Sequence, residues 1–266
     1  MKAVVANRKW PYVWLLSFIM LILLLPVVAT FMYAVAVDWG ISLLPKGWTL
    51  EWLAQLWQDR RFLLALRNSL LICLAAAVVT ILVSFPIVFL VHTRWQRHAQ
   101  WVNVLVTLPF AVPPVVSAVG MLQLYAQGPL AMTGTPWMLI GCYFTIALPF
   151  VYRALDNSFR ALQVNELLAA AYLMGASTRQ AVWYVILPNL KKGLLIALFV
   201  SLSFLMGEFV FANLLASSQF ETLQVYLYSI KNMSGHYSSA LVASYFTIIL
   251  IMTFCLSLID NKAVGD

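Results

Sequence analysis

The sequence predicts an all-α integral membrane protein that forms a single transmembrane domain over residues 1–266. Of its 266 residues, 63% are hydrophobic and only 9% are charged, whereas a soluble globular domain carries roughly 25% charged residues. No stretch is both polar and long enough to form a separate soluble domain. The length accommodates about six helices of ~20 residues with short loops. We expect the six spans at residues 11–37, 63–91, 101–125, 137–159, 193–215 and 240–259.

The first apolar run follows a basic N-terminal segment and extends to Val37. A cleaved signal peptide is the competing interpretation, because Ala34-Val35-Ala36 resembles a cleavage site. The run is longer than the ~7–15 apolar residues of a signal peptide, so we expect an uncleaved span. Residues 38–62 then carry four tryptophans, which suit the external membrane–water interface. We expect a short surface helix there.

The third expected span contains three prolines, Pro109, Pro113 and Pro114. Proline lacks a backbone N–H, so these residues must break the helix near the middle of the membrane. Irregular backbone at that depth is tolerated where it is buried in protein or lines a water-filled cavity. The prolines are therefore predicted to shape a translocation path, with a purely structural kink as the alternative.

The fifth expected span contains one acidic residue, Glu208. An ionisable group inside a membrane costs at least ~2.5 kcal/mol, so it is a functional candidate by default. At ~1.5 Å per residue, Glu208 lies about 24 Å from Lys192, in the outer part of the bilayer. Glu208 is a candidate for the translocation path. Pairing with a loop arginine, or simple hydration, is the alternative.

Residues 166–188 form a polar, small-residue interruption between the fourth and fifth spans. The three alanines at 169–171 are strong helix formers with little side-chain bulk. Gly175 follows where a helix C-terminus favours a residue that adopts positive φ. The small residues would let another protein approach the backbone of this first helix closely.

A second short helix is predicted after this glycine. Ser177 and Gln180 have the spacing of a capping box, which opens a helix. Pro188 then ends or kinks that helix. An ordinary interfacial helical hairpin would share these features.

The spacing of this segment resembles the "EAA loop" of ABC-importer permeases. Ala170 and Ala171, Gly175 four positions later, and the pair Leu187-Pro188 twelve and thirteen positions after the glycine all match the pattern. The chain is similar to the inner-membrane permease subunits of binding-protein-dependent importers, most of all to the group for polyamines, 2-aminoethylphosphonate and ferric iron. The resemblance implies a type I importer permease fold, also called MetI-like, with a cytoplasmic coupling helix.

The motif's glutamate position is occupied by Ala169, and Glu166 lies one helical turn earlier on roughly the same face. The residues implied to couple the permease to its ATPase, within the loop 160–192, are Glu166, Ala169, Ala170, Ala171, Gly175, Ala176, Leu187 and Pro188.

The resemblance also implies partners: two ABC ATPase subunits, a second permease that is identical or homologous, and an extracytoplasmic solute-binding protein. The transported solute is expected to be small and charged, a polyamine or 2-aminoethylphosphonate. Ferric iron or an oxyanion is the alternative within the same class. An ion-gradient-driven secondary transporter is the alternative from another class, although such proteins usually show two related halves with matched broken helices.

The distribution of positive charge predicts that both termini lie in the cytoplasm, and the resemblance implies a bacterial inner membrane. Lysines and arginines collect in cytoplasmic loops, so the net charge of +7 requires no nucleic-acid partner. Five basic residues fall in external segments: Lys46, Arg60, Arg61, Arg67 and Lys231. Eleven fall in the expected cytoplasmic segments: Lys2, Arg8, Lys9, Arg94, Arg97, Arg153, Arg160, Arg179, Lys191, Lys192 and Lys262.

The sequence contains no motif for nucleotide binding, catalysis or metal binding. Without GxxxxGK[ST], the chain has no phosphate-binding P-loop, so ATP hydrolysis is expected on a separate subunit. An intramembrane enzyme would need a nucleophile with a base, or two carboxylates, at membrane depth, and Glu208 stands alone there. His92 and His98 have no acidic or cysteine companion in their loop, so we expect a solvated loop rather than a metal site. No catalytic residue, metal or cofactor is expected.

Overall fold

The computed structural model describes residues 10–42, 44–128, 131–216 and 220–261. These residues are mostly helical and contain no β-strand beyond one isolated bridge between Ala36 and Trp48. Four of the expected cytoplasmic basic residues, Lys2, Arg8, Lys9 and Lys262, lie outside the described residues. The chain divides into two compact units, one of residues 1–60 and 227–248 and one of residues 61–226 and 249–266.

The first unit contains α2 (Trp10–Ala34), α3 (Glu51–Gln58), the end of α13 (Leu223–Ile230) and the first part of α14 (Gly235–Asn261). The His236 ring stacks on Tyr33 at 4.1 Å, and its Nδ1–H donates to the Tyr33 carbonyl oxygen at 2.9 Å. Trp52 stacks on the same imidazole and donates its indole N–H to the Ala36 carbonyl oxygen at 3.0 Å. The short helix expected within residues 38–62 is therefore present as α3, and its start is tied to α2 and α14.

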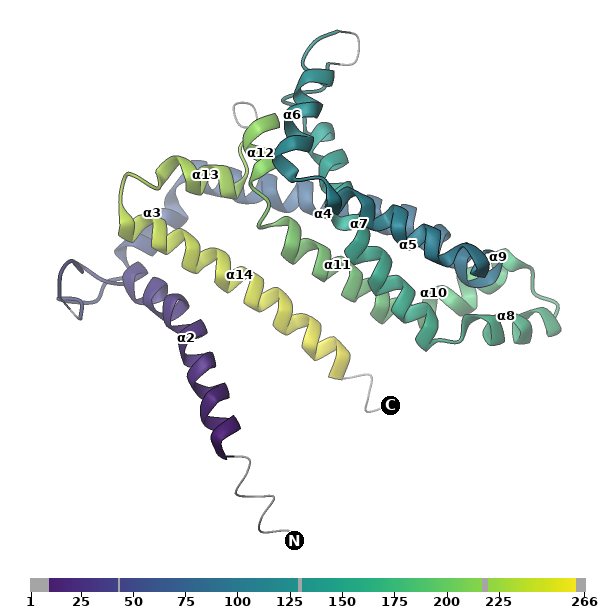
Figure 1. Ribbon diagram of the computed structural model, residues 1–266. Coiled ribbons are helices and arrows are strands. Elements are labelled where there is room, and N and C mark those ends of the chain that lie inside the picture. Colours follow the sequence, from purple (N-terminus) through teal and green to yellow (C-terminus); the bar gives the residue numbers. More distant parts are fainter. Residues whose placement is uncertain (1–9, 43, 129–130, 217–219, 262–266) are drawn as a thin grey trace. The chain divides into compact units, whose positions relative to one another are not determined.

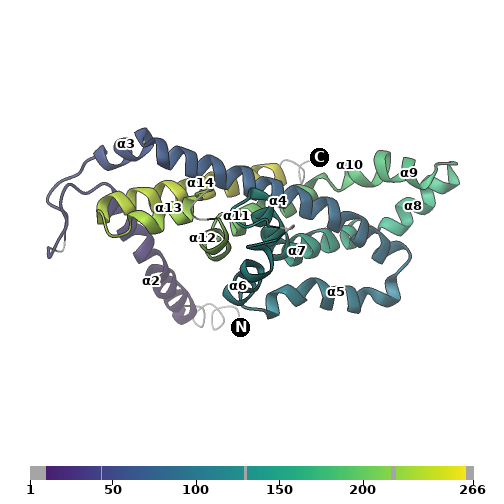
Figure 2. The same ribbon diagram turned by 90° about the horizontal axis from the view of Figure 1, so that it is seen from above.

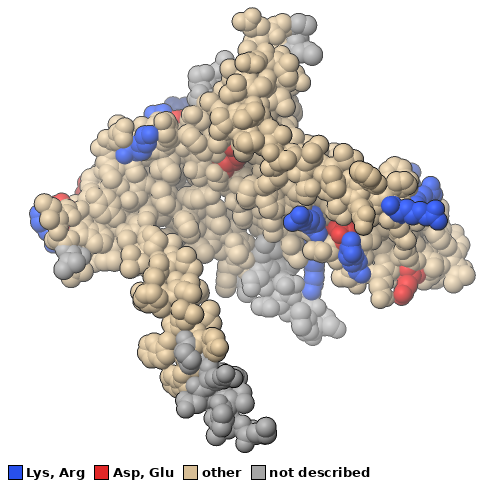
Figure 3. Space-filling model, viewed as in Figure 1, with Lys and Arg blue, Asp and Glu red and all other residues tan. Residues whose placement is uncertain are grey.

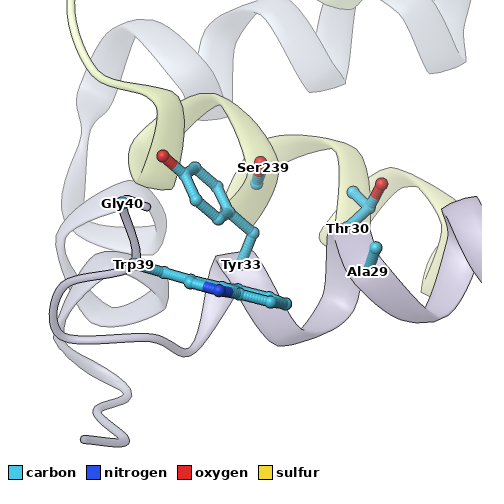
Figure 4. A pocket seen from close by; sticks show the side chains of 6 residues that line it. All are labelled: Ala29, Thr30, Tyr33, Trp39, Gly40 and Ser239. Carbon is cyan, nitrogen blue, oxygen red and sulfur yellow. The ribbon is translucent and has the colours of Figure 1, made fainter. Parts of the chain in front are cut away.

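The loop after α2 is held by an ion pair between Lys46 Nζ and Asp38 Oδ2 at 2.7 Å. This ammonium lowers the pKa of the Asp38 carboxyl below its usual range. A cavity of about 310 Å³ lies where this loop meets α2 and α14. Figure 4 shows the lining residues Ala29, Thr30 and Tyr33 on α2, Trp39 in the loop that follows, and Ser239 on α14.

The second unit contains α4 (Arg60–Thr93), α5 (Ala99–Thr107), α6 (Pro114–Tyr125), α7 (Pro136–Ala161), α11 (Lys191–Leu205) and α12 (Val210–Leu215). Figures 1 and 2 show α4, α5, α7 and α11 running lengthwise beside one another. One end of this unit carries α8 (Val164–Leu173), α9 (Thr178–Ala181) and α10 (Leu187–Asn189), and the other carries α6 and α12.

Four described helices are long and apolar enough to cross a membrane, in Tyr12–Ala34, Arg60–Thr93, Pro136–Ala161 and Gly235–Phe254. Two bent pairs of helices raise the number to six if each pair is one span. The first pair, Gln96–Ala111 and Pro114–Tyr125, bends by 84° at the proline run. It includes the short 3₁₀ helices η1 (Gln96–His98) and η2 (Leu108–Ala111). The expected break in the third span is therefore present.

The region expected to form the fifth span is not one helix. The bent pair here joins Thr178–Asn189 to Lys191–Leu205 at an angle of 65°. The sequence predicts a span over 193–215, whereas α11 ends at Leu205 and α12 begins at Val210. Glu208 lies in the break between them, which decides how its carboxylate is bound.

Candidate functional site

The segment between α7 and α11 begins with α8, which packs one face on the second unit. Gln163, with φ of 48°, turns the chain between α7 and α8. Leu168 and Ala171 are buried, whereas Ala169 and Ala170 are exposed. Glu166 is also exposed and lies in the first turn, where its charge interacts favourably with the helix dipole. The alanine run thus supplies one buried residue and two exposed ones.

Gly175 ends α8 in a Schellman motif. Its φ is +80°, and its N–H donates to the Tyr172 carbonyl oxygen at 2.9 Å. The N–H of Ala176 donates to the Ala171 carbonyl oxygen at 3.0 Å. These two bonds satisfy carbonyl groups that a helix end otherwise leaves without partners. The expected glycine elbow is present, and it requires a residue that tolerates positive φ.

The expected capping box is also present. Ser177 Oγ accepts from the Gln180 backbone N–H at 3.4 Å, and Gln180 Oε1 accepts from the Ser177 N–H at 2.8 Å. Tyr172 on α8 is hydrogen-bonded through its hydroxyl to Thr178 Oγ1 on α9 at 3.1 Å. The two short helices therefore form one hydrogen-bonded hairpin around Gly175.

The second helix of this hairpin changes type before Pro188. Residues Val182–Ile186 form a π-helix, and α10 follows with Pro188 in its first turn. A proline cannot donate to the carbonyl of the preceding turn, and π-helical turns are frequent at functional sites. Leu187 is half-buried and Pro188 is exposed. The expected end of this helix therefore coincides with a local unwinding and with the bend into α11.

The hairpin exposes large apolar side chains. Leu173 and Met174 at its tip are each 89% exposed, and Trp183 and Tyr184 on the second helix are also exposed. Figure 3 shows lysine and arginine side chains gathered near this end of the second unit. Exposed apolar patches rimmed by polar residues mark interaction sites. The tip of the hairpin can therefore pack against another protein.

Side chains of α4 and α7 hold the base of this hairpin. His92 Nε2 lies 2.7 Å from Asp156 Oδ1, and Arg160 Nε donates to Asp156 Oδ2 at 3.0 Å. The His92 ring also stacks on Phe159, with centroids 5.5 Å apart. Asn165 on α8 donates its Nδ2–H to the His92 carbonyl oxygen at 3.2 Å. His92 is thus an ordered helix residue, and our expectation of a solvated loop was wrong for it.

A second candidate site is a cavity of about 670 Å³ between α6, α7, α11 and α12. Pro109, Pro114 and Glu208, which the sequence assigns to one path, all line it, whereas Pro113 lies in the cap of α6 outside the lining. Glu208 is the one charged residue among the described residues that line it. The other lining residues are Phe110, Val112, Ser117, Met121, Cys142, Thr145, Ile146, Ser203, Phe204, Gly207, Phe209, Val210 and Phe211.

The Glu208 carboxylate is bound to the backbone at the start of α12. Its Oε1 accepts from the Phe211 N–H at 3.0 Å, and its Oε2 accepts from the Ala212 N–H at 3.3 Å. The Tyr143 hydroxyl lies 3.5 Å from the Glu208 carbonyl oxygen. Backbone capping therefore satisfies the carboxylate here, an arrangement that neither of our two sequence interpretations included. Within the described residues no group of three or more His, Cys, Asp or Glu side chains could hold a metal ion.

Comparison with known families identifies the kind of protein. A family described as "Binding-protein-dependent transport system inner membrane component" matches residues 63–263. The chain belongs to this family. It is therefore a multi-pass inner-membrane component of a transport system, and the family is one of transport permeases, not enzymes. This confirms the resemblance that the loop spacing suggested.

Two curated relatives show the range of the family. The chain is 26% identical over 231 residues to the putative 2-aminoethylphosphonate transport system permease protein PhnV of Salmonella typhimurium, covering 86% of each chain. It is 28% identical over 206 residues to the sulfate transport system permease protein CysW of Synechocystis, covering 73% of this chain and 70% of that one.

Solved structures give the fold. The crystal structure of a bacterial ABC transporter involved in the import of the acidic polysaccharide alginate superposes with a TM-score of 0.71 at 15% identity, covering 95% of this chain and 96% of that one. The likeness confirms the expected all-α importer-permease fold.

Sequence reasoning missed the contacts between segments. His92 and Asp156 are 64 positions apart, and nothing in the spacing of either residue pairs them. It also missed the helix break around Glu208, although Gly207 beside it is a weak signal for one.

Proposed function

We propose that this chain is one of two permease subunits of an ATP-driven importer, and that residues 160–192 couple it to an ATPase dimer on the cytoplasmic side. The observation that carries the proposal is the hydrogen-bonded hairpin of α8 and α9. Its Schellman motif at Gly175 and its capping box at Ser177 fix the shape of a loop whose tip, Leu173 and Met174, is fully apolar and exposed. Such a tip suits insertion into a groove on another protein.

Charge supports the orientation of this loop. Arg94, Arg160, Arg179, Lys191 and Lys192 all lie in the segments around the hairpin, at the ends of α4, α7 and α9 and at the start of α11. At the other end of α4, Arg61 is neutralised by a bidentate pair with Glu221, at 2.7 and 2.8 Å. The concentration of lysine and arginine at the hairpin end favours the cytoplasm for that end, and hence for both termini.

The mechanism that this arrangement supports is alternating access. Closure of the ATPase dimer on ATP would move the hairpin, and the helices joined to it would open the cavity of Pro109, Pro114 and Glu208 outward. Hydrolysis would reset the helices. No bond is made or broken on this chain, because its part is mechanical.

For the solute, a small charged molecule of the 2-aminoethylphosphonate or polyamine type remains our proposal, supported by the PhnV relative at 26% identity. The sulfate relative supports an oxyanion as the second candidate. The cavity has a single acidic residue and no basic one among its described lining residues. That composition favours a solute that carries an amino group over a bare oxyanion.

The test is a mild-detergent purification of the tagged chain from its native membrane, with partners identified by their peptides. We expect a P-loop ATPase, a second permease and an associated solute-binding protein, which can then be screened with putrescine, 2-aminoethylphosphonate, sulfate and ferric citrate. Recovery of this chain alone, still transporting without ATP, would overturn the proposal in favour of a secondary transporter.

A pair of variants tests the docking surface itself. Met174→Asp places a charge at the exposed tip of the hairpin and should abolish recovery of the ATPase while the second permease is retained. Met233→Asp is the matched control, because Met233 is also highly exposed but lies in the first unit, between α13 and α14. Equal recovery of the ATPase with both variants would exclude Met174 from the docking surface.

A further inference from the structure

The hairpin is continuous in sequence with α7 and α11, but α4 is not adjacent to it in the chain. His92, in the last turn of α4, is 64 positions from Asp156 and 73 positions from Asn165. Any force that reaches α4 from the hairpin must therefore pass through noncovalent contacts.

His92 makes three such contacts in different directions. Its ring nitrogen Nε2 lies 2.7 Å from Asp156 on α7, its ring face stacks on Phe159 one turn further along α7, and its carbonyl oxygen accepts from Asn165 on α8. Phe159 in turn contacts Phe85, also on α4, edge to face at 5.7 Å. The contacts join the C-terminal part of α4 to the end of α7 and the start of α8.

The pair of His92 and Asp156 is shielded from solvent. Their side chains are 17% and 13% exposed, so water and salt screen this contact less than they screen a surface pair. Asp156 also accepts from Arg160 through its second oxygen. Both carboxylate oxygens are therefore engaged, and the geometry of the pair is fixed from two sides.

We propose that His92 and Asp156 are positioning residues that make the end of α4 move as one body with α7 and α8 when the ATPase moves the hairpin. The inference rests on the proposed function, since it assumes that the hairpin docks on the ATPase. It adds that α4 follows the hairpin through the contacts of His92, and that the side-chain pair with Asp156 determines how far a movement of α8 reaches into the membrane-spanning part of the second unit.

The test measures distances in the purified complex with its ATPase, free of nucleotide and with ATP plus vanadate. Spin labels are attached at Trp95→Cys, just after α4, and at Arg179→Cys on α9, in a chain whose native cysteines are replaced by alanine. The labelled chain is diluted with unlabelled chain, so that distances within one subunit dominate. A second label pair, Arg179→Cys with Leu124→Cys at the far end of α6, reports whether the hairpin moves.

With His92 and Asp156 intact, we expect the distance between the labels at positions 95 and 179 to be the same in both nucleotide states. The distance between the labels at positions 124 and 179 should change. With His92→Ala or Asp156→Ala, the distance from 95 to 179 should shift or broaden by several Å on addition of ATP and vanadate. His98→Ala is the matched control, because no hydrogen-bond partner of the His98 ring is found among the described residues. It should behave like the parent chain.

Several results would overturn the inference. The first is a change with nucleotide, in the parent chain, of the distance between the labels at positions 95 and 179. The second is a distance between these labels that stays constant in both alanine variants. If the alanine variants fail to assemble, Asp156→Asn and His92→Gln keep polar side chains in place and should give a smaller shift, whereas no shift counts against the pair. A constant distance from 124 to 179 in the parent chain would instead contradict the proposed function.

Discussion

Gly193, at the start of α11, lies directly against Ser158 near the end of α7. A Cβ atom built at Gly193 would come within 2.5 Å of Ser158 Cβ and closer still to its Oγ. Ser158 cannot turn away freely, because its hydroxyl donates to the Ala154 carbonyl oxygen at 2.8 Å. The absence of a side chain at Gly193 therefore sets how closely α7 and α11 approach at the base of the hairpin.

Gly193→Ala should consequently push α11 away from α7. Inserting a methyl group into a filled contact costs about 1–3 kcal/mol. We expect a lower melting temperature of the purified protein and weaker recovery of the ATPase. Thermal unfolding in detergent, followed by tryptophan fluorescence, measures the first effect.

Two controls test whether the contact with Ser158 causes the loss of stability in Gly193→Ala. Gly141→Ala, within α7, places its methyl group in open space and should leave the melting temperature nearly unchanged. Ser158→Gly combined with Gly193→Ala should recover most of the loss. If the double variant is no more stable than Gly193→Ala alone, the contact with Ser158 is not the reason.

Substitutions at Gly175 should separate backbone conformation from side-chain size. No atom lies within 4 Å of a Cβ built there, so a side chain finds space, and the only obstacle is the φ of +80°. A left-handed conformation costs an ordinary residue about 1–2 kcal/mol, and asparagine adopts it more readily. Gly175→Val should therefore abolish transport while the protein still inserts, and Gly175→Asn should retain most activity. An equal loss of transport in both variants would mean that the size of the side chain, and not the backbone conformation, is the cause.

The capping box predicts a graded series at Ser177. Ser177→Ala removes the acceptor for the Gln180 N–H, and loss of such a cap costs about 0.5–2 kcal/mol. Ser177→Asp restores an acceptor. Hydrogen exchange of the amides at 178–181 should be faster in the alanine variant and close to normal in the aspartate variant. Unchanged exchange in Ser177→Ala would show that the cap contributes little to the hairpin.

The cavity can be tested without knowing the solute. Ser117 lines it from α6, so Ser117→Cys, in a chain without native cysteines, should react with a membrane-impermeant thiol reagent from one side only in each nucleotide state. External reagent should label it with ATP and vanadate bound and not in the nucleotide-free complex. Leu105→Cys, on the exposed surface of α5, is the control and should show no dependence on nucleotide. Identical labelling of Ser117→Cys in both nucleotide states would show that the cavity is not part of the translocation path.

Local sequence determined the parts of this fold that depend on near neighbours. Gly175, Ser177 and Gln180 lie within six positions, so propensity and capping rules predicted the hairpin correctly, and the three prolines predicted the bend after α5. The contact of Gly193 with Ser158 and the pair of His92 with Asp156 join residues 35 and 64 positions apart. Such contacts depend on which helices pack together, and no period or motif in one sequence reports that. Glu208 shows the same limit, because an apolar run concealed a break that only the bonds to α12 reveal.

Glu208 offers a direct comparison of a structural and a transport role. The carboxylate bonds to the N–H groups of Phe211 and Ala212, and leaving a buried donor without a partner costs about 1–3 kcal/mol. Glu208→Ala should therefore accelerate hydrogen exchange at 211 and 212 and destabilise the protein. Glu208→Gln keeps one oxygen as an acceptor and should be stable, with slower exchange than the alanine variant. If the charge also serves the solute, uptake by the stable glutamine variant falls several-fold; uptake equal to that of the parent chain restricts Glu208 to capping α12.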